Sequence, residues 1–385
     1  MIRRLHTLVK KGTLLIHSWR VGPSFTQCRH SAIGRFYIFP LFRGKDNWPP
    51  VVTPLSWSLI GMLVAIDMIC LLLAPLKFAN SNLWIIGALS LGFLLWIGVF
   101  RLIFYRLKDD MSYQASALRS VAHGGDLLVR AIAFTTFFGW AGGTYLCLAT
   151  TMALPLQDAT LASLDQILHF DWLAFLALCN SSPIVSWTLF VAYHSAFPQM
   201  VLLYILLSFS RREAQLAEFL TLFCITFVAT CFLMLLVPAA GAYPYYQPRR
   251  ELFDRFSVDA GMWHYEVFIL LRTEATPVLK FGYMKGLVTF PSFHTALAII
   301  TAYAARSIPF IALPAVILNG FVIVSTLPEG GHFLVDVLAG AIVALVGIAL
   351  VRWKYAAWIV KCRSPYRPQP AHVPKRGSRR CCVRR

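Results

Sequence analysis

Eight apolar segments alternate with polar stretches along this chain of 385 residues. The hydrocarbon core of a bilayer is about 30 Å thick, which about 20 helical residues cross, and a single apolar segment must satisfy its own backbone hydrogen bonds. The pattern therefore predicts eight transmembrane helices, of which the sixth is short. They are expected at residues 56–76, 83–104, 130–150, 184–208, 217–239, 292–306, 308–327 and 332–353.

A ninth apolar stretch, residues 161–178, is interrupted by Asp165, His169 and Asp171. Ionisable side chains are costly in the hydrocarbon core, so this stretch is expected to lie along the membrane interface. His194 also falls inside a predicted span. A structural hydrogen bond is the commoner reason for such a residue, and no chemical role is assigned to it.

The fold expected is an all-α polytopic membrane protein with about eight transmembrane helices. Residues 1–55 form a basic N-terminal arm and residues 354–385 a basic tail. Between them, residues 56–129 hold two additional transmembrane helices and a cytoplasmic loop, and residues 130–353 hold a core of six helices. No soluble domain fits between the spans.

Basic residues are distributed unevenly between the two sides of the predicted membrane. The chain is 58% hydrophobic and 14% charged, with a formal net charge of +18. An even number of spans places both termini on one side, and that side carries 28 of the 35 Lys and Arg residues. Positive loops stay in the cytoplasm, so both termini are predicted to be cytoplasmic. This bias accounts for the net charge, and no nucleic-acid partner is predicted.

Most of the remaining basic residues lie in one loop. Six of the seven Lys and Arg residues on the opposite side fall between residues 249 and 285. They run against the positive-inside rule, which indicates a local anion. The alternative is that a long translocated loop tolerates charge, because acidic residues in the same loop partly neutralise it.

The first chemical motif is Pro291-Ser292-Phe293-His294, at the start of the sixth span. Pro291 breaks the preceding segment, and Ser292 is placed to cap the helix that follows. A helix N-terminus offers free N–H groups and the positive end of the dipole, which together bind phosphate. An ordinary capped helix start is the simpler interpretation of this motif by itself.

The second motif begins with Gly330 and Gly331 and continues with His332 and Asp336. Glycines leave the backbone open to an anion. His332 and Asp336 stand at positions i and i+4, on one helix face. The carboxylate can accept the N–H of one ring nitrogen, so that the other presents its lone pair. A chance pairing of an interfacial aspartate with a histidine is the alternative.

The predicted topology brings the two motifs together. The sixth span begins on the outer side and the seventh and eighth follow after short turns, so His294 and His332 open onto the same face. The basic loop lies on this face as well. Together they predict a site for moving a phosphoryl group.

Pro291-Ser292-Phe293-His294 and the His-x-x-x-Asp spacing from His332 to Asp336 resemble motifs of the type-2 phosphatidic acid phosphatase superfamily. The family's usual serine of the third motif falls at Ser325. The extended stretches 286–294 and 330–340 look most like its inositolphosphotransferase or aureobasidin-resistance branch, which includes inositol phosphorylceramide synthases. The resemblance covers the six-helix core, roughly residues 130–353.

Two departures from the family pattern concern phosphate binding. The arginine that usually follows the third-motif serine is replaced by Thr326, and the first motif, Lys-x6-Arg-Pro, is missing. Other groups must then bind phosphate, and the candidates are Arg272 and Lys285, with Ser292 and Gly331 at the helix starts. These departures weaken the expectation of simple phosphatase activity.

The resemblance and the chemistry together imply a phosphohistidine enzyme. His332 is expected to attack the phosphorus of a lipid-linked phosphoester, Asp336 to orient it, and His294 to protonate the leaving oxygen. Backbone N–H groups and cations can stabilise the charge, so neither a metal nor a cofactor is predicted.

The expected protein is a multi-pass enzyme of the plasma membrane, or bacterial inner membrane, with its active site on the extracytoplasmic side. A phosphotransferase acting on a lipid phosphate or phospholipid is favoured. The alternatives are a lipid phosphate phosphatase and a catalytically silent lipid transporter of the same fold. The sequence does not predict an oligomeric state.

Overall fold

A computed structural model describes residues 51–73, 77–284, 286–306 and 308–363, with side chains up to Trp353. These residues fall in one compact unit, Pro49–Arg385. Helices dominate the described residues, and the strands among them are two short ones that pair in parallel, β1 (Lys77–Phe78) and β2 (Val278–Leu279). The helices are α1 (Pro54–Leu73), α2 (Asn80–Arg106), α3 (Tyr113–Thr151), α4 (Asp158–Ile167), α5 (Trp172–Ser181), α6 (Pro183–Phe209), α7 (Glu213–Leu236), α8 (Ala242–Tyr246), α9 (Tyr265–Thr273), α10 (Phe293–Ala305), α11 (Ala312–Ser325) and α12 (Leu334–Arg363).

Each of the eight predicted spans coincides with a helix. Six of these, α1, α2, α3, α6, α7 and α12, are long and apolar enough to cross a membrane. α10 and α11 have 13 and 14 residues, which at a rise of 1.5 Å per residue gives only about 20 Å each. The multi-pass character is confirmed, whereas the number of eight spans and the sidedness of the termini stay predictions.

Two segments differ from the prediction. α3 begins at Tyr113, so most of the cytoplasmic loop expected before residue 130 is helical. The charged residues of this stretch have partners inside the protein: Arg130 contacts the buried carboxylate of Asp126 at 2.7 Å. The ninth apolar stretch forms α4 and α5, which meet at a bend of 77° and together resemble a broken span or a re-entrant loop. Its expected position at the interface is not tested.

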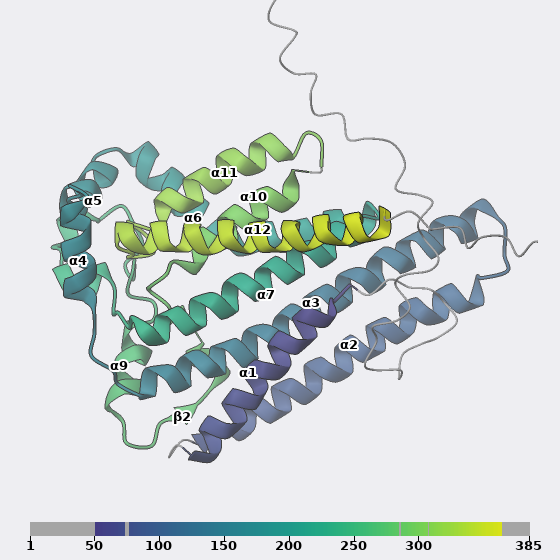
Figure 1. Cartoon of the computed structure of the whole chain (residues 1–385), viewed down its shortest axis with the longest axis horizontal. Coiled ribbons are helices and arrows are strands. Elements are labelled where there is room, and N and C mark those ends of the chain that lie inside the picture. The colour runs from purple at the N-terminus through teal and green to yellow at the C-terminus, as the bar shows by residue number, and fades with distance from the viewer. Residues whose placement is uncertain (1–50, 74–76, 285, 307, 364–385) are drawn as a thin grey trace, which may run out of the picture. The chain divides into compact units, whose positions relative to one another are not determined.

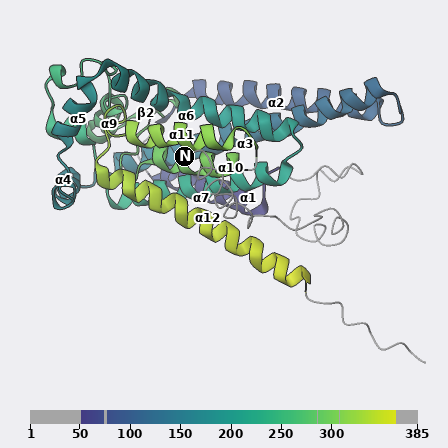
Figure 2. The same ribbon diagram turned by 90° about the horizontal axis from the view of Figure 1, so that it is seen from above.

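The core lies where α3, α6, α7, α10 and α12 pack against one another (Figures 1 and 2). α10 contacts α6, α7, α11 and α12, and is therefore central despite its short length. α2 packs on α3 and leaves its most apolar stretch unburied, as expected of a helix that faces lipid. α1, in contrast, packs against α3 and α7, and its Leu63 lies in the same buried cluster as residues of these helices. The division into two additional spans and a core of six helices stays a prediction.

The connection from α7 to α10 folds over the start of α12 and shapes the loop at residues 326–333. The N–H of Ala242 donates to the carbonyl of Gly331 at 2.8 Å, and the N–H of Gly261 donates to the carbonyl of Glu329 at 2.8 Å. The hydroxyl of Tyr243 donates to the carbonyl of Pro328. These bonds hold the loop that carries His332.

Candidate active site

The two histidine motifs meet at the starts of α10 and α12. The N–H of Ser292 donates to the carbonyl of Asp336 at 2.9 Å. A Cβ on Gly340 would lie 2.2 Å from the carbonyl oxygen of Ser292, so the two helices approach too closely for any side chain there. The expectation that both motifs share one end of the core is therefore met.

His332 lies two residues before α12, and its side chain is only 5% exposed. Its Nδ1 is 3.4 Å from Oδ2 of Asp336, slightly beyond hydrogen-bond distance, while the same Oδ2 accepts the N–H of Phe333 at 2.9 Å. Burial lowers the pKa of His332 to about 4, against the opposing effect of a hydrogen bond with the Thr289 backbone. The ring is therefore neutral at pH 7 and retains a lone pair for attack on phosphorus.

The backbone of His332 is fixed from two sides. Its N–H donates to the carbonyl of Thr326 at 3.1 Å. Its carbonyl accepts the indole N–H of Trp172 at 3.0 Å. Trp172 is the first residue of α5, so the bent pair of α4 and α5 helps to position the nucleophile.

His294 is the second residue of α10 and is half-buried. Ser292 caps this helix as predicted, because its Oγ accepts the N–H of Thr295 at 3.3 Å. The His294 ring stacks on Tyr193 of α6, with ring centres 4.6 Å apart, and meets the edge of Phe197. Two aromatic side chains therefore set the orientation of the expected acid.

The glycine at position 331 is required by packing. Its φ of 70° favours glycine, and a Cβ there would lie 2.6 Å from the Cα of Gly261. At the start of α12, the N–H groups of Leu334 and Val335 both donate to Asp165 at 2.9 Å. A carboxylate of the protein therefore occupies part of the anion-binding end of this helix. Phosphate binding by Gly331 and Ser292 stays a prediction.

Of the two predicted basic residues, the structure describes Arg272, whose contacts are with other segments than the two histidine motifs. The guanidinium of Arg272 donates to the carbonyl of Leu154 at 2.8 Å and lies over the ring of Phe268. Lys285 lies outside the described residues. Their roles in phosphate binding stay predictions.

Three polar residues near His294 and His332 were not among the site residues predicted from the sequence: Glu329, His194 and His264. Glu329 is fully buried and accepts from His194, whose Nε2 is 3.1 Å from Oε1 of Glu329. His264 is buried with its Nε2 3.0 Å from the carbonyl of Ala240. The signal for His194 was its place inside an apolar segment, but its partner follows 135 residues later and no local pattern connects them.

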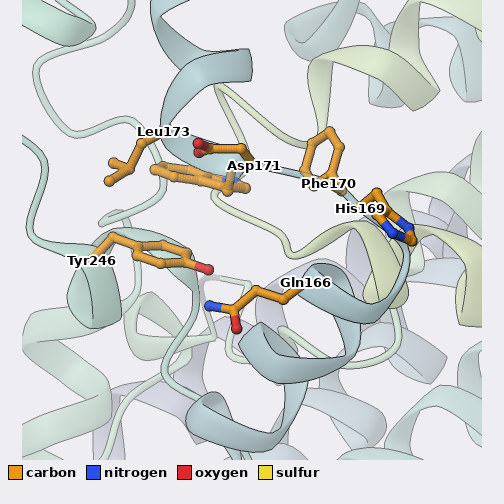
Figure 3. Close-up of a pocket in the computed structure, with 7 residues that line it drawn as sticks. Gln166, His169, Phe170, Asp171, Leu173 and Tyr246 are labelled. Carbon is orange, nitrogen blue, oxygen red and sulfur yellow. The ribbon is translucent and has the colours of Figure 1, made fainter.

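A cavity of about 400 Å³ opens beside the bend between α4 and α5 (Figure 3). Gln166, Asp171, Trp172 and Tyr246 are among the residues that line it. The ring of Tyr246 stacks on Trp172 with centres 5.5 Å apart, and Trp172 in turn bonds to His332. Trp172 therefore belongs both to the cavity wall and to the contacts that fix the backbone of His332.

Among the described residues, no group of three or more His, Cys, Asp or Glu side chains is arranged to hold a metal ion. The histidines of the site instead stand beside single carboxylates: His332 by Asp336 and His194 by Glu329.

Comparison with known proteins agrees with this geometry at the level of a superfamily. No curated protein and no solved structure is significantly similar to the chain. The family model of the PAP2 superfamily matches residues 159–350, which include His294, His332 and Asp336. Over the stretch that builds the site, the chain is thus similar to the PAP2 superfamily of membrane phosphatase-type proteins.

Proposed function

We propose that this protein is an integral membrane enzyme that moves a phosphoryl group from a lipid-linked phosphoester through a phosphohistidine on His332. The observation that carries the proposal is the direct bond between the two motifs, from the N–H of Ser292 to the carbonyl of Asp336. It holds a neutral histidine with a carboxylate neighbour next to a second histidine, within the region that matches the PAP2 superfamily.

The first half-reaction breaks the phosphoester. The lone pair of His332 attacks phosphorus, the bond from phosphorus to the leaving oxygen breaks, and His294 gives its proton to that oxygen. Asp336 stabilises the positive ring that forms. In the second half-reaction the oxygen of an acceptor hydroxyl or water bonds to phosphorus and loses its proton to a base. The bond from phosphorus to His332 breaks, and the ring regains its lone pair.

Transfer to an alcohol is the favoured second step, in line with the resemblance to the inositolphosphotransferase branch. Thr326 supports this choice, because it stands where phosphatases of the superfamily have an arginine. It is fully buried, its hydroxyl donates to the carbonyl of Ile323 at 2.7 Å, and its own carbonyl holds the N–H of His332. At this position the side chain and the carbonyl of Thr326 both form hydrogen bonds with the backbone, and no cation is present to bind phosphate. Transfer to water, which would make a lipid phosphate phosphatase, is the alternative, and a silent lipid transporter is a second one.

The proposed site opens on the extracytoplasmic side of the plasma membrane or bacterial inner membrane. The positive-inside rule supports this assignment, because the predicted eight-span topology puts the segments that lead into α10 and α12 on the side opposite to most of the Lys and Arg residues.

The experiment is to incubate the purified protein with labelled lipid phosphates and phosphoinositides, with and without alcohol acceptors, and to identify the products by mass spectrometry. A new phosphoester of the acceptor supports the transferase, and free phosphate in its place supports the phosphatase. Lipid binding without either product, in wild type as in His332→Ala, supports the transporter.

A further inference from the structure

A second histidine and carboxylate pair lies beside the proposed active site. Glu329, three residues before His332, is completely buried, and its Oε1 is 3.1 Å from Nε2 of His194 on α6. The same carboxylate accepts the N–H of Ser257 at 3.2 Å and the hydroxyl of Ser257. These three partners all donate hydrogen bonds to the Glu329 carboxylate. Burying a carboxylate without such partners would cost free energy.

The pair is joined to both proposed catalytic histidines. Tyr193, the neighbour of His194, stacks on His294. A Cβ on Gly330 would lie 2.9 Å from the Tyr193 ring and 3.1 Å from the His332 ring, so Tyr193 borders the His332 loop as well. The rings of Tyr193 and His194 also meet edge to face, with centres 5.4 Å apart. The three histidines therefore form one cluster around Tyr193.

The members of this cluster differ in exposure. The side chain of His194 is 41% exposed, whereas that of His332 is 5% exposed. The ring of His194 is flanked by Phe190 and Trp263, at centre distances of 4.6 and 5.8 Å. His194 is thus the most exposed histidine of the cluster.

The carboxylate determines which nitrogen of His194 carries hydrogen. An ionised carboxylate only accepts hydrogen bonds, so the hydrogen between Glu329 and His194 belongs to Nε2. The neutral ring then has its lone pair on Nδ1, away from Glu329. Glu329 also stabilises the positive ring that forms when Nδ1 takes up a proton. A histidine that acts as a general base needs both features: a free lone pair, and a carboxylate that stabilises its protonated ring.

We propose that His194, positioned by Glu329, is the general base that activates the acceptor in the second half-reaction. This inference rests on the proposed function above. The acceptor, an alcohol or water, gives its proton to Nδ1 of His194 while its oxygen bonds to phosphorus and the bond from phosphorus to His332 breaks. His194 then releases the proton to solvent, and His294 takes up a proton before the next cycle.

A separate base has a consequence for a transferase. One histidine that serves first as acid and then as base places the leaving group and the acceptor at the same position. Two histidines on either side of Tyr193 let the two molecules occupy different positions. The pair therefore suits an acceptor that differs in shape from the leaving group.

The test separates the two half-reactions. p-Nitrophenyl phosphate and dioctanoyl phosphatidic acid serve as donors and glycerol as acceptor, with rapid-quench detection of the leaving group and of phosphohistidine. His194→Gln and Glu329→Gln are expected to release one equivalent of leaving group at the wild-type rate. Turnover then slows by about 100-fold, the usual contribution of a general base, and phosphate accumulates on His332.

The control is His123→Gln. His123 and Glu213 form another histidine and carboxylate pair, 2.6 Å apart, between α3 and α7, and this variant is expected to behave as wild type. Equal slowing of both half-reactions in His194→Gln, or unchanged turnover in it, contradicts the role of His194. Absence of phosphohistidine in wild type and variants alike contradicts the proposed function instead. Thermal unfolding checks that the three variants fold. If His194→Gln does not fold, Glu329→Gln gives the same readout.

Discussion

The N–H of Ser292 and the carbonyl oxygen of Asp336 are 2.9 Å apart, and this bond joins two segments that are 44 positions apart in the chain. The close approach depends on Gly340, where a Cβ would lie 2.2 Å from the Ser292 carbonyl oxygen. The distance between the proposed acid and nucleophile therefore depends on a residue that takes no part in the chemistry.

Gly340→Ala is expected to push α10 and α12 apart. A displacement of about 1 Å at a reacting centre costs about 100-fold in rate, so turnover should fall by that order. Steady-state kinetics of the purified variant measure it. Gly139→Ala in α3 is the matched control, because a Cβ there meets nothing within 4 Å. Equal activities of the two variants would show that the close approach is not needed.

Asp165→Asn should loosen the start of α12. The Asp165 carboxylate accepts the N–H groups of Leu334 and Val335, and the amide that replaces it accepts with one atom only. Loss of a helix cap costs about 1 kcal/mol, so thermal unfolding should shift to lower temperature and turnover should fall. Asp171→Asn is the control, since Asp171 caps the separate helix α5 through Ala174. A stability loss from Asp171→Asn alone would contradict this account of α12.

Stability should fall with acid because His264 and His332 are buried in the neutral form. Burial lowers the pKa of His264 to about 4, and repulsion from a protonated His332 lowers it further. An unfolded histidine has a pKa of about 6.5, so the unfolded chain binds more protons between pH 6.5 and 4. The two histidines therefore contribute fully to the free energy of unfolding above pH 6.5, and this contribution is lost as the pH falls toward 4. Unfolding temperatures across this range measure the slope, and His264→Gln should make it shallower. An unchanged slope in that variant would be evidence against the assignment.

Treatment with EDTA is expected to leave turnover unchanged. The proposed chemistry uses histidines, carboxylates and backbone groups, and it routes no step through a metal ion. Product formation before and after chelation, followed by dialysis, measures this. Complete loss of activity that Mg²⁺ or Zn²⁺ restores would contradict the metal-free mechanism.

The helices of the core were predictable because apolar length alone specifies a membrane helix. Each predicted span has a helix, and the cap by Ser292 follows from its place after Pro291. The N-terminal extension of α3 was missed, since charged side chains argue against a span. Arg130 and Asp126 show why it still forms, as each is the other's partner.

The two histidine motifs could be predicted from the sequence, whereas the residues that contact and position them could not. His294, His332 and Asp336 stand in short patterns, so local spacing reveals them. The contacts of Glu329 with Ser257 and His194, and of Asp165 with α12, cross the chain between distant segments. Side chains in such contacts leave no periodic signal. For the same reason Arg272 was a candidate for phosphate binding, although its guanidinium donates to the carbonyl of Leu154.

The most direct test of the account is to trap the covalent intermediate. Purified protein is mixed with labelled lipid phosphate, quenched in alkali, which preserves phosphohistidine, and analysed by peptide mass spectrometry. Phosphate is expected on His332 in wild type, none in His332→Ala, and slower labelling in His294→Ala. Phosphate on another residue, or full turnover by His332→Ala, would contradict it.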